Sequence, residues 1–146
     1  MDYIGIDYGT KIIGLSWGND DLGIAVPLEA IKNFHTEGAA FQMLEQRLKE
    51  YACDAFVLGL PLHMDGKEGK RVVEVKNFSH QLQLKFNKPI FFQDERLSTQ
   101  TAFELLAPRL RSLKRAKKQK QSGILDSQSA AVILQDFLNN KKHLLP

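Results

Sequence analysis

The stretch Ile4-Gly5-Ile6-Asp7-Tyr8-Gly9-Thr10-Lys11 places one carboxylate at the end of an apolar run that leads into a turn. Isoleucine and tyrosine favour a buried pleated surface, whereas aspartate is depleted in strands because its short polar side chain prefers turns and caps. Two interpretations of Asp7 are open. It shapes the turn before Gly9, or it belongs to a functional site.

The elements that follow predict an α/β fold. Two further strands, at 12–17 and 23–31, are joined by turns short enough to require antiparallel pairing. A helix capped by Thr36 comes next. The apolar run 55–61 predicts a buried parallel strand, and a helix connects it to another strand at 90–92. We therefore predict a single mixed five-stranded sheet, with three antiparallel strands then two parallel strands and helices on both faces.

Two more acids fall at positions that could meet Asp7. Glu95 follows the strand 90–92, and ligands bind at the carboxyl ends of strands in open α/β sheets. A helix capped by Ser98 or Thr99 is expected after it. In the last helix, the spacing from Asp126 to Phe137 puts Asp126 on the buried face near the helix start, although on local grounds an N-terminal cap is the stronger explanation. Residues 139–146 are predicted to form a frayed tail.

Three converging carboxylates would repel one another unless a cation sat among them. Hard oxygen ligands without a His or Cys cluster favour Mg²⁺ or Mn²⁺ over Zn²⁺. Two such ions about 4 Å apart can activate a water and stabilise the leaving oxygen in a phosphodiester displacement. His63 and Asp65 are further candidate site residues, with an ordinary exposed loop as the alternative.

Composition and charge describe an acidic body with a basic arm. The 146 residues are 43% hydrophobic, which predicts one domain over residues 1–146. The lone Cys53 and the lack of a long apolar segment point to the cytoplasm rather than a membrane. Residues 109–120 hold seven cations and no acid, whereas the rest of the chain holds 13 cations and all 17 acids. We predict a mobile loop at about 109–122 that binds a phosphate backbone.

Four motifs together resemble the YqgF family: residues 5–11, residues 57–62 with Met64-Asp65-Gly66, residues 94–99, and Asp126 before Ala130-Ala131. The family is described as Holliday junction resolvases and as pre-16S ribosomal RNA nucleases. The resemblance implies a ribonuclease H-like fold and a divalent-metal-dependent endonuclease. It also implies that Asp7, Glu95 and Asp126 are the catalytic, metal-binding acids. The residues expected to bind nucleic acid are Lys11, Arg96, Lys114, Arg115, Lys117, Lys118 and Lys120.

Two departures from the family pattern bear on the site. Ile12 stands where the family usually has arginine, and Ser127 where a charged residue often follows the last acid. Both predict weaker phosphate contacts near the metal ligands.

Two other functions fit parts of the sequence. One is a non-catalytic RNA- or ribosome-binding module. The other is a fragment of an actin-like ATPase, whose phosphate-binding hairpin begins similarly but which needs two such domains. The three acids do not separate a DNA junction from a precursor ribosomal RNA as substrate, although the family favours RNA. Symmetric junction cleavage favours a homodimer, whereas RNA trimming needs only a monomer.

Overall fold

The computed structural model describes residues 1–62, 69–95 and 123–144. They contain a five-stranded sheet in the order β3-β2-β1-β4-β5. Strand β1 pairs antiparallel with β2, which pairs antiparallel with β3, while β4 runs parallel to both β1 and β5. The predicted fold class is confirmed. The strand bounds are β1 Asp2–Asp7, β2 Ile13–Asn19, β3 Ala25–Ile31, β4 Ala55–Leu60 and β5 Ile90–Asp94.

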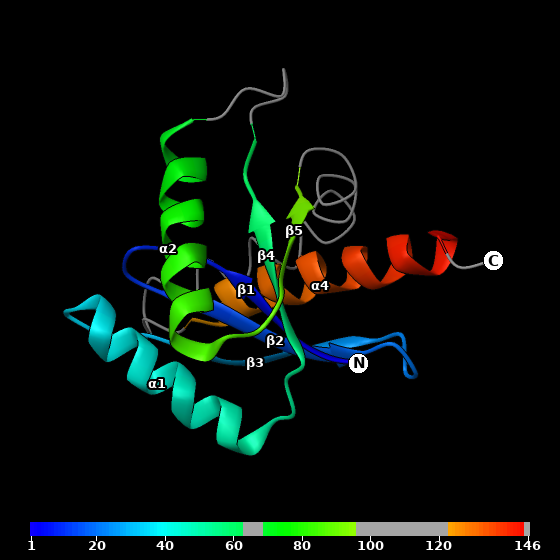
Figure 1. Cartoon of the computed structure of the whole chain (residues 1–146), viewed down its shortest axis with the longest axis horizontal. Helices are drawn as coiled ribbons and strands as arrows, with labels where there is room; N and C mark the ends of the chain where they lie inside the picture. The colour runs from blue at the N-terminus through cyan, green and yellow to red at the C-terminus, as the bar shows by residue number, and fades with distance from the viewer. Residues whose placement is uncertain (63–68, 96–122, 145–146) are drawn as a thin grey trace.

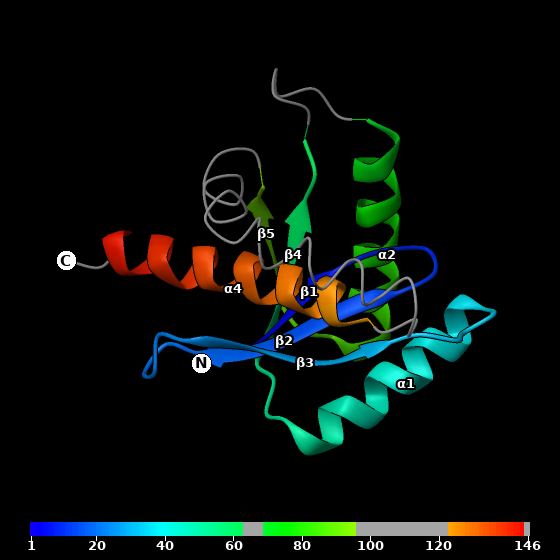
Figure 2. The same ribbon diagram turned by 180° about the vertical axis from the view of Figure 1, so that it is seen from behind.

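Helices cover both faces of the sheet, as Figures 1 and 2 show. Helix α4 (Ile124–Leu144) crosses one face, and helices α1 (Glu37–Glu50) and α2 (Lys70–Phe86) lie on the other. Thr36 caps α1 as predicted, since its Oγ1 accepts a hydrogen bond from the Ala39 amide at 3.1 Å. The helix expected after Ser98 or Thr99 lies outside the described residues. No helix in the described part of the chain is long and apolar enough to cross a bilayer.

Alternation along β1 decides which face each functional residue occupies. Tyr3 packs with Ile133 and Leu134 of α4, whereas Ile4 and Ile6 belong to the core formed with α1 and α2. Successive strand residues point to opposite faces. Asp7 therefore lies on the face covered by α4, here called the α4 face, and the next residue in the chain points to the opposite face.

Helix α4 is longer than the sequence predicted. It continues through Leu144, so a frayed tail from residue 139 was wrong. The Asn140 amide donates to Gln93 Oε1 at 3.4 Å, and the Lys141 ammonium donates to the Tyr3 hydroxyl and, at 3.2 Å, to Asp20 Oδ2. These contacts join residues far apart in the sequence, so local periodicity could not indicate them.

Candidate active site

Asp7 is the last residue of the central strand β1. It pairs with Gly14 of β2, and the parallel register that joins Ile6 to Leu58 carries Gly59 of β4 alongside it. Asp7 is thus a strand residue and not part of the turn that follows. Its side chain is half-buried on the α4 face.

The two glycines beside Asp7 admit the other two predicted acids. A side chain at Gly14 would collide with the backbone of Asp126 and Ser127, so glycine lets the first turn of α4 rest on β2. A Cβ at Gly59 would lie 2.9 Å from Glu95 Cδ, so glycine there leaves space for the Glu95 carboxyl group above β4. Asp126 and Glu95 therefore flank Asp7 on the α4 face, at the carboxyl end of β1.

Buried hydrogen bonds fix the start of α4 on the sheet. The register between β2 and β3 shifts between Ile13 and Leu15, and the Leu15 amide donates to Ser127 Oγ at 3.3 Å. The Ser16 hydroxyl donates to the Ala130 carbonyl at 2.8 Å. These bonds hold the turn that carries Asp126 over Gly14. Asp126 lies inside the first helical turn, because α4 begins at Ile124, so it is not the helix cap.

The two departures from the family pattern have packing roles. Ser127 is 3% exposed and accepts the bond from β2 just described. Ile12 Cγ2 lies 3.3 Å from the position of a Cβ on Gly123, so Ile12 packs against the entry to α4. The expectation that phosphate contacts are weaker at both positions stays a prediction.

Glu95 has an environment that disfavours its charge. Burial raises the pKa of its carboxyl group, and the nearby Asp94 raises it further, while Arg71 acts in the opposite direction. The proximity of Arg71 to Glu95 was not predicted from the sequence. A signal existed, since a cation in the first turn of a helix opposes the helix dipole and so needs another reason.

The remaining predicted site residues are only partly described. Lys11 is exposed in the connection between β1 and β2. Arg96 and the basic loop at 109–122, with Lys114, Arg115, Lys117, Lys118 and Lys120, lie outside the described residues, as do His63 and Asp65. Within residues 1–62, 69–95 and 123–144, no group of three or more His, Cys, Asp or Glu side chains is arranged to hold a metal ion. The fold thus places Glu95 and Asp126 around Asp7 without forming a closed ligand set.

Comparison with known proteins identifies the family. The family described as "RuvX: Holliday junction resolvase" matches residues 1–140. The chain belongs to the RuvX family. RuvX and YqgF denote the same family, so the resemblance drawn from the four motifs is confirmed. Membership over nearly the whole chain also removes the reason for regarding it as an actin-like ATPase fragment.

Relatives of similar length share more than a third of the sequence. A protein of Lactobacillus acidophilus, named "Putative pre-16S rRNA nuclease", is 37% identical over 141 residues, covering 95% of this chain and 96% of its own. A protein of Aeromonas salmonicida with the same name is 38% identical over 140 residues, covering 94% of each.

A solved structure supports the fold. The RuvC chain of a T. thermophilus complex with a Holliday junction substrate superposes with a TM-score of 0.56 at 15% identity, covering 97% of this chain and 96% of its own. The RuvX chain therefore has the ribonuclease H-like fold predicted from the sequence.

Proposed function

We propose that this RuvX chain is a divalent-metal-dependent endonuclease in which Asp7, Glu95 and Asp126 bind Mg²⁺ or Mn²⁺. The observation that carries the proposal is that Gly14 and Gly59, on the strands on either side of Asp7, lie against the Asp126 backbone and the Glu95 carboxyl group. Carboxylate oxygens are the ligands that hard divalent cations prefer. Such an ion supplies a water of lowered pKa and positive charge for the phosphate oxygens.

The residues of the chain perform separate tasks in this proposal. Asp7 and Asp126 hold negative charge at fixed positions, because β1 and the anchored first turn of α4 are rigid elements. Burial disfavours the charged form of Glu95, so a cation bound beside it would stabilise that form. Lys11 and Arg71, both exposed near this end of the sheet, would bind the phosphates flanking the cleaved bond.

We further propose that the substrate is precursor 16S ribosomal RNA, with a four-way DNA junction as the second candidate. The names of the relatives favour RNA, and the family description favours the junction. The chain would act as a single cytoplasmic domain, as a monomer on RNA or as a homodimer on a symmetric junction.

A side-by-side cleavage assay tests the proposal. Purified protein is offered a mobile four-way DNA junction, a matched DNA duplex and an RNA with an unprocessed 16S 5′ end, each with Mn²⁺, with Mg²⁺ and with chelator. We expect cleavage of the RNA only when a divalent ion is present. Cleavage of the junction alone would reverse the order of the two substrates. Binding without cleavage under every condition would instead favour the non-catalytic RNA-binding module.

A further inference from the structure

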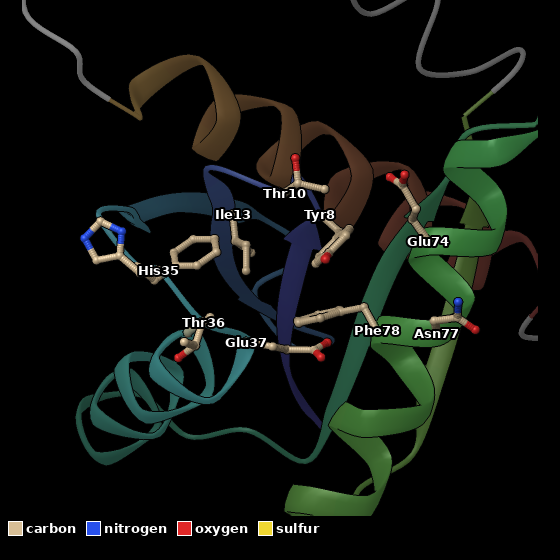
Figure 3. A pocket seen from close by; sticks show the side chains of 11 residues that line it. Tyr8, Thr10, Ile13, His35, Thr36, Glu37, Glu74, Asn77 and Phe78 are labelled. Carbon is tan, nitrogen blue, oxygen red and sulfur yellow. The ribbon is translucent and has the colours of Figure 1, made fainter.

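A pocket of about 330 Å³ lies on the sheet face opposite to Asp7. It opens between the end of β1, the start of α1 and the middle of α2, as Figure 3 shows. Its volume is at the lower end of the range for small-ligand sites, about 300–1,000 Å³. None of the roles assigned above to the acids or the basic residues uses this pocket.

Aromatic rings form one wall of the pocket. The Tyr8 ring stacks on Phe78, with centroids 4.3 Å apart and planes 30° apart. Phe78 stacks in turn on Phe41 at 5.3 Å and is 2% exposed, so it fixes the Tyr8 ring from behind. Tyr8 and Phe34 are half-buried and line the pocket. Such a supported aromatic surface suits stacking of a planar ring.

Two carboxylates lie on either side of these rings. Glu37 comes from the first turn of α1 and Glu74 from α2, with Tyr8 and Phe78 between them (Figure 3). Burial first, and then both carboxylates, raise the pKa of Tyr8, so its hydroxyl stays protonated. Neither lysine nor arginine lines the pocket in the described part of the chain. Carboxylates only accept hydrogen bonds, so the part of the pocket beside Glu37 and Glu74 favours N–H donors and repels phosphate. The remaining polar side chains of the lining are Thr10, His35, Thr36 and Asn77.

We propose that this pocket binds an unpaired guanine base of the nucleic-acid substrate. Guanine presents two adjacent donors, N1–H and the N2 amino group, which fit the two oxygens of one carboxylate. Adenine, cytosine and uracil each place an acceptor beside their donor, and that acceptor would face a carboxylate oxygen. The inference rests on the proposed nuclease function, because the guanine is taken to be the base next to the phosphodiester bond that is cleaved.

The position of the pocket explains how one strand reaches both sites. Asp7 and Tyr8 are consecutive, so their Cα atoms are about 3.8 Å apart, yet they point to opposite faces of the sheet. A single strand that crosses the connection between β1 and β2, where Thr10 and Lys11 are exposed, would present a phosphate to Asp7 on one side. On the other side it presents a neighbouring base to the pocket. The pocket would then select the nucleotide beside the scissile phosphate.

Binding of short RNA in the presence of chelator tests the proposal without cleavage. Three labelled pentamers of uridine are compared by fluorescence anisotropy, with guanosine, inosine or uridine at the central position. A bidentate contact gives about 1–3 kcal/mol of discrimination, so the guanosine pentamer should bind about 5- to 150-fold more tightly than all-uridine. Inosine lacks the N2 amino group and should fall between them. Equal affinities, or no binding of the guanosine pentamer, would overturn the proposal.

Two double variants separate recognition of the base from the general effect of negative charge on binding of the phosphate chain. Removing negative charge strengthens binding of a phosphate chain, so Glu45→Gln with Glu50→Gln, both exposed on α1 outside the pocket, should tighten all three pentamers equally. Glu37→Gln with Glu74→Gln should instead lose the preference for guanosine. If the preference were retained, the pocket would not be the site that recognises guanine.

The test is independent of nuclease activity. A guanosine preference in a protein that cleaves no substrate would support guanine binding by the pocket and reject the proposed nuclease activity. Cleavage without the preference would reject guanine binding alone.

Discussion

Two ends of the molecule, the last turns of α4 and the carboxyl ends of β1 and β4, place acids in opposite electrostatic situations. At the far end, burial pushes the pKa of Asp20 upward, but hydrogen bonds from Lys141, the N-terminal amine and Tyr3 outweigh it and hold that pKa below its usual value. At the site end, burial raises the pKa of Glu95 and Arg71 offsets this only in part. The chain supplies cations to Asp20. Glu95 is instead an acid that a cation from solution would stabilise.

The largest expected effect is the loss of cleavage when Asp7 is neutralised, with neutralisation of Asp20 as the control. Asp7→Asn keeps the shape of the side chain but removes a metal-binding charge, and cleavage should fall by about 100-fold or more because a bound ion contributes several kcal/mol. Asp20→Asn, at the opposite end, should cleave at the wild-type rate. Initial rates with Mn²⁺ on the RNA substrate measure both. Metal-dependent cleavage at the wild-type rate in Asp7→Asn would remove the proposed site.

Binding should separate from cleavage in the site variants. Glu95→Gln and Asp126→Asn should also lose cleavage, yet gel shifts should show nucleic-acid binding as strong as in the wild type or stronger, since each change reduces repulsion of phosphate. Parallel loss of binding and cleavage in all of these variants would indicate a folding role for the acids.

The next effect concerns the basic segment 109–120. This segment lies in the sequence between Glu95 and Gly123 and carries seven cations. Replacing Lys114, Arg115, Lys117 and Lys118 by Gln should reduce the slope of log affinity against log salt by about 3.

A control for this variant exists on the described helices. Lys49 and Lys85 lie in the last turns of α1 and α2, and their replacement by Gln should leave the slope unchanged. If the fourfold variant kept the wild-type slope of log affinity against log salt, the phosphate contacts would instead be assigned to Lys11 and the stretch 67–71.

Metal should stabilise the fold by relieving repulsion at the site end. Saturation at 100 times the dissociation constant adds about 2.7 kcal/mol, which corresponds to a rise in Tm of roughly 5–10 °C. Chelator should reverse the rise, and the Asp7→Asn protein should show less of it. Thermal scans with and without excess Mn²⁺ measure this. Coincident transitions in the wild type would show that the acids do not bind the ion.

The smallest effect is a pair of stability changes of opposite sign. The raised pKa of Glu95 favours folding below its unfolded pKa of about 4.5 and loses that contribution as pH rises through the folded value. Glu95→Gln should therefore raise the metal-free Tm at pH 8 by a few degrees, with no gain near pH 4.

Asp20 has a lowered pKa, so its contribution is present above about pH 3.8 and lost as pH falls further. Asp20→Asn should lower Tm at pH 8 by about 2–4 °C, as expected for an ion pair worth up to about 1 kcal/mol. If Glu95→Gln and Asp20→Asn changed Tm at pH 8 in the same direction, the proposed electrostatic difference between the two ends would be wrong.

Sequence alone predicted the features that short segments determine. The apolar run at 55–61 and the turn-rich connections gave the strand directions, and the rule that ligands bind at strand ends selected Glu95. Asp7 and Asp126 required the family resemblance, because a turn or a cap explained each of them locally.

The features that sequence missed depend on distant partners. The last turns of α4 are held by Tyr3, Asp20 and Gln93, and Ser127 is buried where it accepts a hydrogen bond from the Leu15 amide of β2. The pocket near Tyr8 combines β1, α1 and α2, so no single motif contains it.

The anchoring of α4 also has a consequence for the order of folding. The bond between Leu15 and Ser127 spans 112 residues, and the one between Ser16 and Ala130 spans 114. Contacts so distant in sequence carry a high loop-closure entropy and form slowly. During synthesis, strands β1 to β3 leave the ribosome long before α4 exists to cover them. The proposed site, which includes Asp126 of α4, therefore assembles only when the chain is nearly complete.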